Sequence, residues 1–175
     1  MNRDQVFISY SHADGDWLKR LQIMLTPLRR QGMLDVWEDT RIQVGQDWKA
    51  EIEKALARAK VAMLLVSPDF LASDFIARHE LPPLLEAAKK QGATIFWVPL
   101  RHSLYRVTEV ARYQAAYDPG TPLSTLTLAE QDAALVRIAE ALIAVESSPV
   151  STSPPETPEP VRPDRVVLPS VKYIH

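Results

Sequence analysis

The sequence predicts an α/β domain built on a doubly wound, parallel five-stranded sheet with helices on both faces. Two patterns carry this prediction. Short segments that are apolar at almost every position alternate with longer segments in which apolar residues recur at steps of three and four. Strands that are apolar on both faces are typical of parallel sheets covered by helices on each side. With 175 residues, the chain is long enough for one such domain and a tail.

The strands and helices follow each other along the chain. Four strands are expected at residues 6–10, 33–37, 61–66 and 93–98, and a fifth near residues 112–117. Helical periodicity runs from Trp17 to Leu28 and from Trp48 to Ala59. In a doubly wound chain with right-handed crossovers, we expect the flavodoxin-like strand order 2-1-3-4-5.

Capping patterns mark the helix ends. Two helices are expected to close on a pair of cations, a Gln and a glycine, in the segments Arg29-Arg30-Gln31-Gly32 and Lys89-Lys90-Gln91-Gly92. Asp16 stands where an N-cap is expected. Thr127 and Glu130 form a capping box that opens a last helix, which runs to about residue 145.

Composition and charge limit the partners that we expect. Lys and Arg number 20 against 22 Asp and Glu, the net charge is −2, and there is no cysteine. Neither charge forms a block, so we expect this domain to contact no nucleic acid and no membrane. The lack of cysteine excludes disulfides and thiolate metal sites. No apolar run reaches the roughly 18 residues that cross a bilayer, and we expect a cytoplasmic protein.

The proline content changes near the end of the chain. Seven of the 14 prolines lie between Pro149 and Pro169. Repeated proline favours extended polyproline II structure with a solvated backbone. We therefore expect residues 1–146 to form the domain and residues 147–175 to form a linker that leads to a second domain.

In the expected strand order, ligands bind at the carboxyl ends of the first and third strands, which places segments 11–16 and 67–80 at the site. Known motifs do not fit these segments. His12, Asp14 and Asp16 have the character of hard metal ligands, but Leu25 stands where a calcium loop needs its closing Glu, so a turn followed by an N-cap is the commoner interpretation of these residues. A phosphoacceptor receiver needs an acid where Ser67 stands. Neither GxGxxG nor GxxxxGK[ST] occurs, and we expect no metal.

Glu80 is less ordinary than the other acids of these segments. Steps of four place it between Ile76 and Leu84, at the border of an apolar stripe, where its carboxylate is partly shielded. Pro82 and Pro83 follow directly and should kink the helix or restart it. Spacing alone still favours the commoner interpretation of a helical Glu, which is a solvated side chain.

An ordered set of short motifs covers about residues 5–145. It consists of Val6-Phe7-Ile8-Ser9-Tyr10-Ser11, then Asp35-Val36-Trp37-Glu38-Asp39 running into Ile42-x-x-Gly45-x-x-Trp48, then Leu65-Val66-Ser67-Pro68-Asp69-Phe70-Leu71-Ala72-Ser73 followed by Glu80-Leu81. This set resembles a bacterial TIR (Toll/interleukin-1 receptor) domain. That family has the flavodoxin-like fold expected above, and Ile76 stands where many members have Trp.

The resemblance implies an enzyme that cleaves nicotinamide from NAD+, giving ADP-ribose or a cyclic isomer, in bacterial defence signalling. Glu80 matches the glutamate that carries this reaction, with NAD+ as substrate and no cofactor. Residues 40–47 match a self-association loop, so we expect other TIR domains as partners in a homo-oligomer or filament. The residues of that loop that we single out are Arg41, Ile42, Val44 and Gly45. The implied substrate contacts are Tyr10, Ser11, His12, Trp37, Asp39, Trp48, Ser73 and Ile76.

Three questions stay open at this point, each with two possible answers. The chain is either this enzyme or a TIR adaptor that only binds other TIR domains; Glu80, for which an adaptor has no evident use, favours the enzyme. Trp48 is either a core anchor, as its spacing with Ile52 indicates, or part of a site between subunits. Ile42 and Val44 either pack on their own domain or dock on a second copy.

Overall fold

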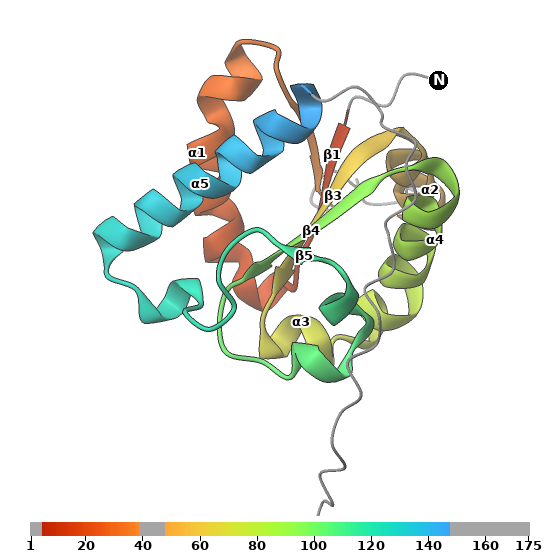
Figure 1. Ribbon diagram of the computed structural model, residues 1–175. Helices are drawn as coiled ribbons and strands as arrows, with labels where there is room; N and C mark the ends of the chain where they lie inside the picture. Colours follow the sequence, from red (N-terminus) through yellow and green to blue (C-terminus); the bar gives the residue numbers. More distant parts are fainter. Residues whose placement is uncertain (1–4, 39–47, 148–175) are drawn as a thin grey trace, which may run out of the picture.

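The computed structural model describes residues 5–38 and 48–147, which form one five-stranded sheet with flanking helices (Figure 1). The strand order is β2-β1-β3-β4-β5, and each neighbouring pair is parallel, which confirms the expected order. The strands are β1 (Gln5–Ser9), β2 (Asp35–Glu38), β3 (Ala59–Val66), β4 (Thr94–Pro99) and β5 (Gln114–Ala115).

The described α-helices cover both faces of this sheet. They are α1 (Gly15–Arg30), α2 (Trp48–Arg58), α3 (Pro68–Ala72), α4 (Leu81–Gln91) and α5 (Leu128–Ser147). Helices α1 and α5 lie on one face, and α2 and α4 lie on the other (Figure 1). This arrangement is the doubly wound architecture that the alternation of strand and helix predicts.

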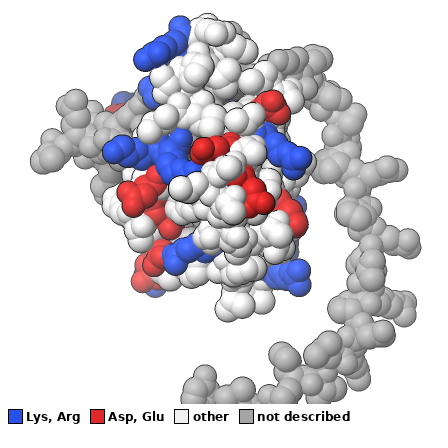
Figure 2. All heavy atoms as spheres, turned by 90° about the vertical axis from the view of Figure 1, so that its left-hand side faces the viewer, with Lys and Arg blue, Asp and Glu red and all other residues white. Residues whose placement is uncertain are grey.

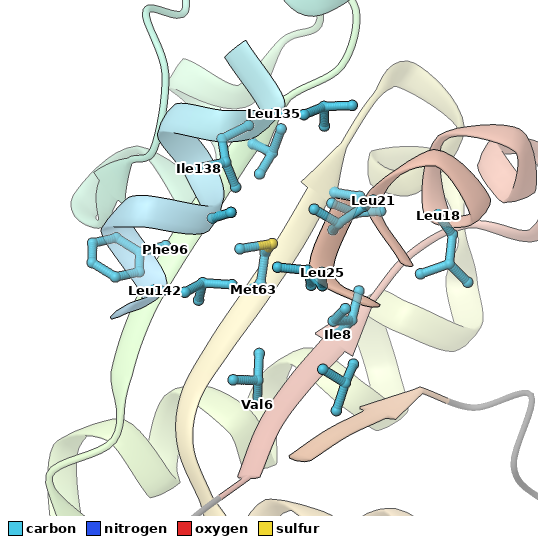
Figure 3. Close-up of a cluster of buried hydrophobic side chains, with 14 of the residues drawn as sticks. Val6, Ile8, Leu18, Leu21, Leu25, Met63, Phe96, Leu135, Ile138 and Leu142 are labelled. Carbon is cyan, nitrogen blue, oxygen red and sulfur yellow. The ribbon is translucent and has the colours of Figure 1, made fainter. Parts of the chain in front are cut away.

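Two apolar cores form because alternate side chains of each strand point to opposite faces. The core between the sheet and helices α1 and α5 is shown in Figure 3 and includes Val6, Ile8, Leu21, Met63 and Ile138. The core on the α2 and α4 side includes Phe7, Leu56, Leu64, Phe70, Ile76 and Leu84. Burial of each such side chain contributes about 1.5–3 kcal/mol, so β1 is held firmly from both sides.

The second strand begins two residues later than the expected segment 33–37. Gly32 has a φ of 69°, a left-handed conformation that favours glycine, and the Met33 amide donates to the Leu28 carbonyl at 3.0 Å. Met33 therefore still belongs to the turn that closes α1. The fifth strand lies inside the expected segment 112–117, but only two of its residues pair with β4.

Besides Gly32 at the end of α1, two more of the expected helix ends are confirmed, and one is wrong. Gly92, with a φ of 75°, ends α4. The Thr127 amide donates to the Glu130 carboxylate at 2.8 Å, and the Glu130 amide donates back to the Thr127 hydroxyl at 3.3 Å, as in a capping box. Asp16 does not cap α1, because that helix already begins at Gly15. Asp16 lies in its first turn, where a negative charge still favours the helix dipole.

The outer side of α1 and α5 carries acidic and basic side chains that are interspersed (Figure 2). One pair joins the two helices, because Arg20 of α1 lies 3.0 Å from the carboxylate of Asp132 on α5. No helix in the described ranges is long and apolar enough to cross a membrane.

Candidate functional site

The candidate site lies at the carboxyl end of β1, beside the switch point between β1 and β3 at which the order of the strands reverses. Ser9 is the last residue of this strand, and its side chain shares a face with Phe7, because Ile8 and Tyr10 belong to the opposite core. Ser9 is only 2% exposed. A hydroxyl is thus buried at the carboxyl end of β1, on the side of the sheet that α2 and α4 cover.

Glu80 is brought to this hydroxyl from 71 residues further along the chain. The Ser9 Oγ donates a hydrogen bond to the Glu80 Oε2 at 2.6 Å. Glu80 is itself 2% exposed, so the common expectation of a solvated helical Glu is wrong. Burial of a carboxylate is costly unless hydrogen bonds satisfy it, and Ser9 supplies one of these bonds.

A π-helical turn, η3 (Ile76–Glu80), carries Glu80 into this position. The Leu81 amide donates to the Ile76 carbonyl, five residues back, instead of to the residue four back. Pro82 and Pro83 explain the wider turn, because neither has an N–H and each ring would clash with the carbonyl four residues earlier in an α-helix. The helix then restarts as α4 with both prolines in its first turn, as the sequence predicts.

Two predicted substrate contacts belong to the same turn. Ser73 ends α3, and its Oγ accepts from the Ile76 amide at 3.3 Å, so it fixes the start of η3. Ile76 is buried in the α2 and α4 core, one turn away from Glu80. Beside it, Phe75 is 40% exposed and its ring lies 5.5 Å from the ring of His79. In the structure, Ser73 and Ile76 therefore support the turn that presents Glu80.

The loop after β1 holds three more predicted contacts. Tyr10 is buried, and its ring lies 5.6 Å from that of His12, which is exposed. Ser11 caps the short 3-10 turn His12–Asp14 by accepting from the Ala13 amide at 3.4 Å. The loop is thus ordered by its own side chains at the same edge of the sheet as Ser9.

A second polar cluster, Asp14–Ser67–Arg101, joins the loops that follow β1, β3 and β4. The Ser67 hydroxyl donates to the Asp14 carboxylate, and Arg101 lies 3.9 Å from the same carboxylate while it also binds Asp69. Burial raises the pKa of the Asp14 carboxyl; the Ser67 hydrogen bond and Arg101 oppose this rise, and Asp69 adds to it. We interpreted Asp14 from the sequence as a turn residue, but it is 4% exposed and ties three loops together.

The remaining predicted residues are described in part or not at all. Asp39 and the loop residues Arg41, Ile42, Val44 and Gly45 lie outside the described residues, as do residues 148–175 of the expected linker. Trp37 is placed on β2, where it pairs with Phe7 of β1, and Trp48 opens α2.

Sequence reasoning placed Ser67 in a segment at the expected site without giving it a role, and it did not assign Ser9 or Arg101 to a site. Ser9 and Ser67 carry a signal in hindsight, because each is a small polar residue directly at the carboxyl end of an apolar strand.

The described residues include no group of three His, Asp or Glu side chains that could hold a metal. A hollow of about 400 Å³ lined by Thr26, Arg29, Arg30, Leu34 and Asp35 lies at the other end of the sheet, beside the start of β2.

Comparison with known proteins identifies the class to which this doubly wound domain belongs. A family described as "TIR domain" matches residues 6–140. A protein of Sinorhizobium fredii (strain NBRC 101917 / NGR234), described as "Uncharacterized protein y4lF", is 31% identical over 137 residues, which make up 78% of this chain and 42% of that protein. The chain belongs to the TIR domain family, and it spans less than half the length of this relative.

Two solved structures are also similar to this chain. The TIR domain of the Toll-related receptor TRR-2 from Hydra magnipapillata is 19% identical, with a TM-score of 0.46 over 66% of this chain and 86% of that one. The TIR domains of the activated Roq1 resistosome, which directly recognizes the pathogen effector XopQ, are 21% identical, with a TM-score of 0.48 over 82% of this chain and 83% of that one.

Proposed function

We propose that this TIR domain cleaves the bond between nicotinamide and ribose in NAD+, with Glu80 as the catalytic residue. The observation that supports this most is the burial of the Glu80 carboxylate beside Ser9 at the carboxyl end of β1. This buried acid lies on a π-helical turn and belongs to neither apolar core. Positions of this kind are frequent at functional sites.

The reaction needs few protein groups. The nicotinamide ring in NAD+ carries a positive charge, so it takes the bonding electron pair and leaves as a neutral molecule without an acid. The ribose becomes cationic at the same moment, and a carboxylate close to it stabilises this charge. At about 4 Å and an effective dielectric near 20, the attraction is about 4 kcal/mol, which corresponds to roughly three powers of ten in rate. Water then bonds to the cationic ribose carbon and loses a proton to the solvent, which gives ADP-ribose; a nucleophilic group of the ADP-ribose part that bonds to this carbon instead gives a cyclic isomer.

The low exposure of Glu80 adds a requirement to this proposal. A carboxylate that is 2% exposed contacts a substrate only after the groups that cover it have moved. We propose that association of TIR copies, through the segment 40–47, drives this movement. The activity then depends on assembly, as signalling in bacterial defence requires.

The test is release of nicotinamide from NAD+ by the purified chain, measured by chromatography. Glu80→Gln keeps the size of the side chain and removes its charge, so we expect turnover to fall at least about tenfold, which is 1.4 kcal/mol. Glu86→Gln is the matched control, because Glu86 is exposed on α4 and pairs with Lys90; its turnover should be unchanged.

Two outcomes would contradict the proposal. Unchanged turnover in a folded Glu80→Gln protein would remove Glu80 from the mechanism. If the wild-type chain released no nicotinamide even at high concentration, the adaptor alternative would be favoured instead.

A further inference from the structure

We propose that the Ser9 hydroxyl is the group that holds the Glu80 carboxylate in its catalytic orientation, an inference that rests on the proposed function. Ser9 acts through Glu80 and does not itself contact the ribose. It is therefore a positioning residue for the reaction.

The contact has the geometry of a strong hydrogen bond to a charged acceptor. The two oxygens are 2.6 Å apart, and hydroxyl-to-carboxylate bonds of 2.5–2.7 Å are typical when the acceptor is ionised. Both residues are 2% exposed, so water does not compete for this bond as it does at the surface. The bond thus fixes where one oxygen of the carboxylate lies.

The two partners differ in how firmly their backbones are held. Ser9 ends the inner strand β1, whose residues pair with β2 on one side and β3 on the other, and Ser9 itself pairs with Leu64. Glu80 ends a π-helical turn, and its side chain has three torsions that must be ordered. A rigid donor at the end of an inner strand supplies the fixed point that this side chain needs.

The residue type at position 9 supports the same conclusion. Phe7, the residue of β1 two positions earlier on this face, contributes to an apolar core and is 1% exposed. Alanine would fit such a surface without any polar group to satisfy. A serine hydroxyl buried there is costly unless it is bonded, and it donates its hydrogen bond to the Glu80 carboxylate.

The expected consequence is a loss of rate rather than of affinity. A misplacement of about 1 Å at the reacting centre can cost about a hundredfold in rate. Because Ser9 is buried behind the carboxylate, we expect Ser9→Ala to lower kcat by about tenfold or more and to change KM by less than about twofold. A bond that served only to stabilise the fold would lower the folded fraction without changing kcat per folded molecule.

The experiment is a double-mutant cycle on nicotinamide release, with the folded fraction of each variant measured by circular dichroism. The variants are Ser9→Ala, Glu80→Gln and the two combined. If Ser9 acts through Glu80, Ser9→Ala has little further effect on kcat in the Glu80→Gln background. Thr26→Ala is the control, since the Thr26 hydroxyl bonds the Gln22 carbonyl within α1, at the other end of the sheet; its kcat per folded molecule should stay within about twofold of wild type.

The possible failures are distinct from one another. Full activity in Glu80→Gln would overturn the proposed function itself. If Glu80→Gln is inactive but Ser9→Ala keeps its kcat, only the role of Ser9 is overturned. The same holds if the reductions in kcat of the two single variants multiply in the double variant. If Ser9→Ala does not fold, Ser9→Cys keeps the size and offers a weaker donor; we expect its kcat to fall at least about threefold, and an unchanged kcat would contradict the inference.

Discussion

The Ser67 hydroxyl donates to the buried Asp14 carboxylate and accepts from the Phe70 amide at 3.0 Å, so one side chain joins the start of α1 to the start of α3. Ser67→Ala should therefore lose an N-cap and leave a buried carboxyl without one donor. We expect the free energy of unfolding to fall by about 1–3 kcal/mol. Urea denaturation checks this prediction, and a loss below about 0.5 kcal/mol would contradict it.

The raised pKa of Asp14 predicts how stability depends on pH. Burial is its largest cause, and the folded chain consequently binds this proton more tightly than the unfolded chain. The stabilising contribution of Asp14 is complete below its ordinary pKa of 3.8 and is lost as the pH rises through the folded value. Relative to Asp14→Asn, which does not titrate, the wild type should lose stability between pH 4 and neutral pH. Denaturation of both proteins at several pH values tests this direction. If the stability of the wild type relative to Asp14→Asn rose with pH, the prediction would be wrong.

The prolines after η3 make a prediction about geometry. Replacing Pro82 and Pro83 by alanine restores two N–H groups and relieves the clash that disfavours an α-helical turn. We expect η3 to tighten, Glu80 to rotate away from Ser9, and kcat to fall at least about threefold, which is less than 1 kcal/mol. Pro68→Ala, at the exposed first position of α3, is the control and should leave kcat unchanged. A double variant as active as wild type would show that the π-helical turn does not depend on these prolines.

The burial of Glu80 predicts that specific activity depends on protein concentration. If a neighbouring copy opens the site, nicotinamide release per molecule should rise by at least about threefold over a hundredfold range of concentration, because assembly follows mass action. Gly45→Pro, in a segment outside the described residues, should stiffen the association loop and reduce this rise. Constant specific activity in a protein that is monomeric by light scattering would contradict this prediction and would indicate that Glu80 acts within a single chain.

The fold was more predictable from the sequence than the site. Strands such as Ala59–Val66 are apolar on both faces, so their burial, direction and order follow from local pattern and chain connectivity. The second strand shifted by two residues because the left-handed Gly32 extends the end of α1 by a turn that periodicity does not reveal. Element boundaries of this kind depend on single hydrogen bonds.

The environment of Glu80 shows why the site was harder to predict. Steps of four place Glu80 at the border of an apolar stripe, but these steps assume α-helical geometry, and the π-helical turn adds one residue at this point. Its contact with Ser9 joins residues 71 positions apart, which no local pattern encodes. Asp14 was likewise expected in a turn, and its burial depends on Ser67 and Arg101 from two other loops.

The two-residue strand β5 also affects how the protein behaves at high concentration. It pairs only Gln114 and Ala115 with β4, so this edge of the sheet offers few unpaired N–H and C=O groups in line. Long, flat sheet edges recruit strands from other molecules and lead to aggregation, whereas short edge strands prevent it. When the domain is concentrated, this edge therefore offers little backbone on which a strand of another molecule could pair and begin a cross-β fibril.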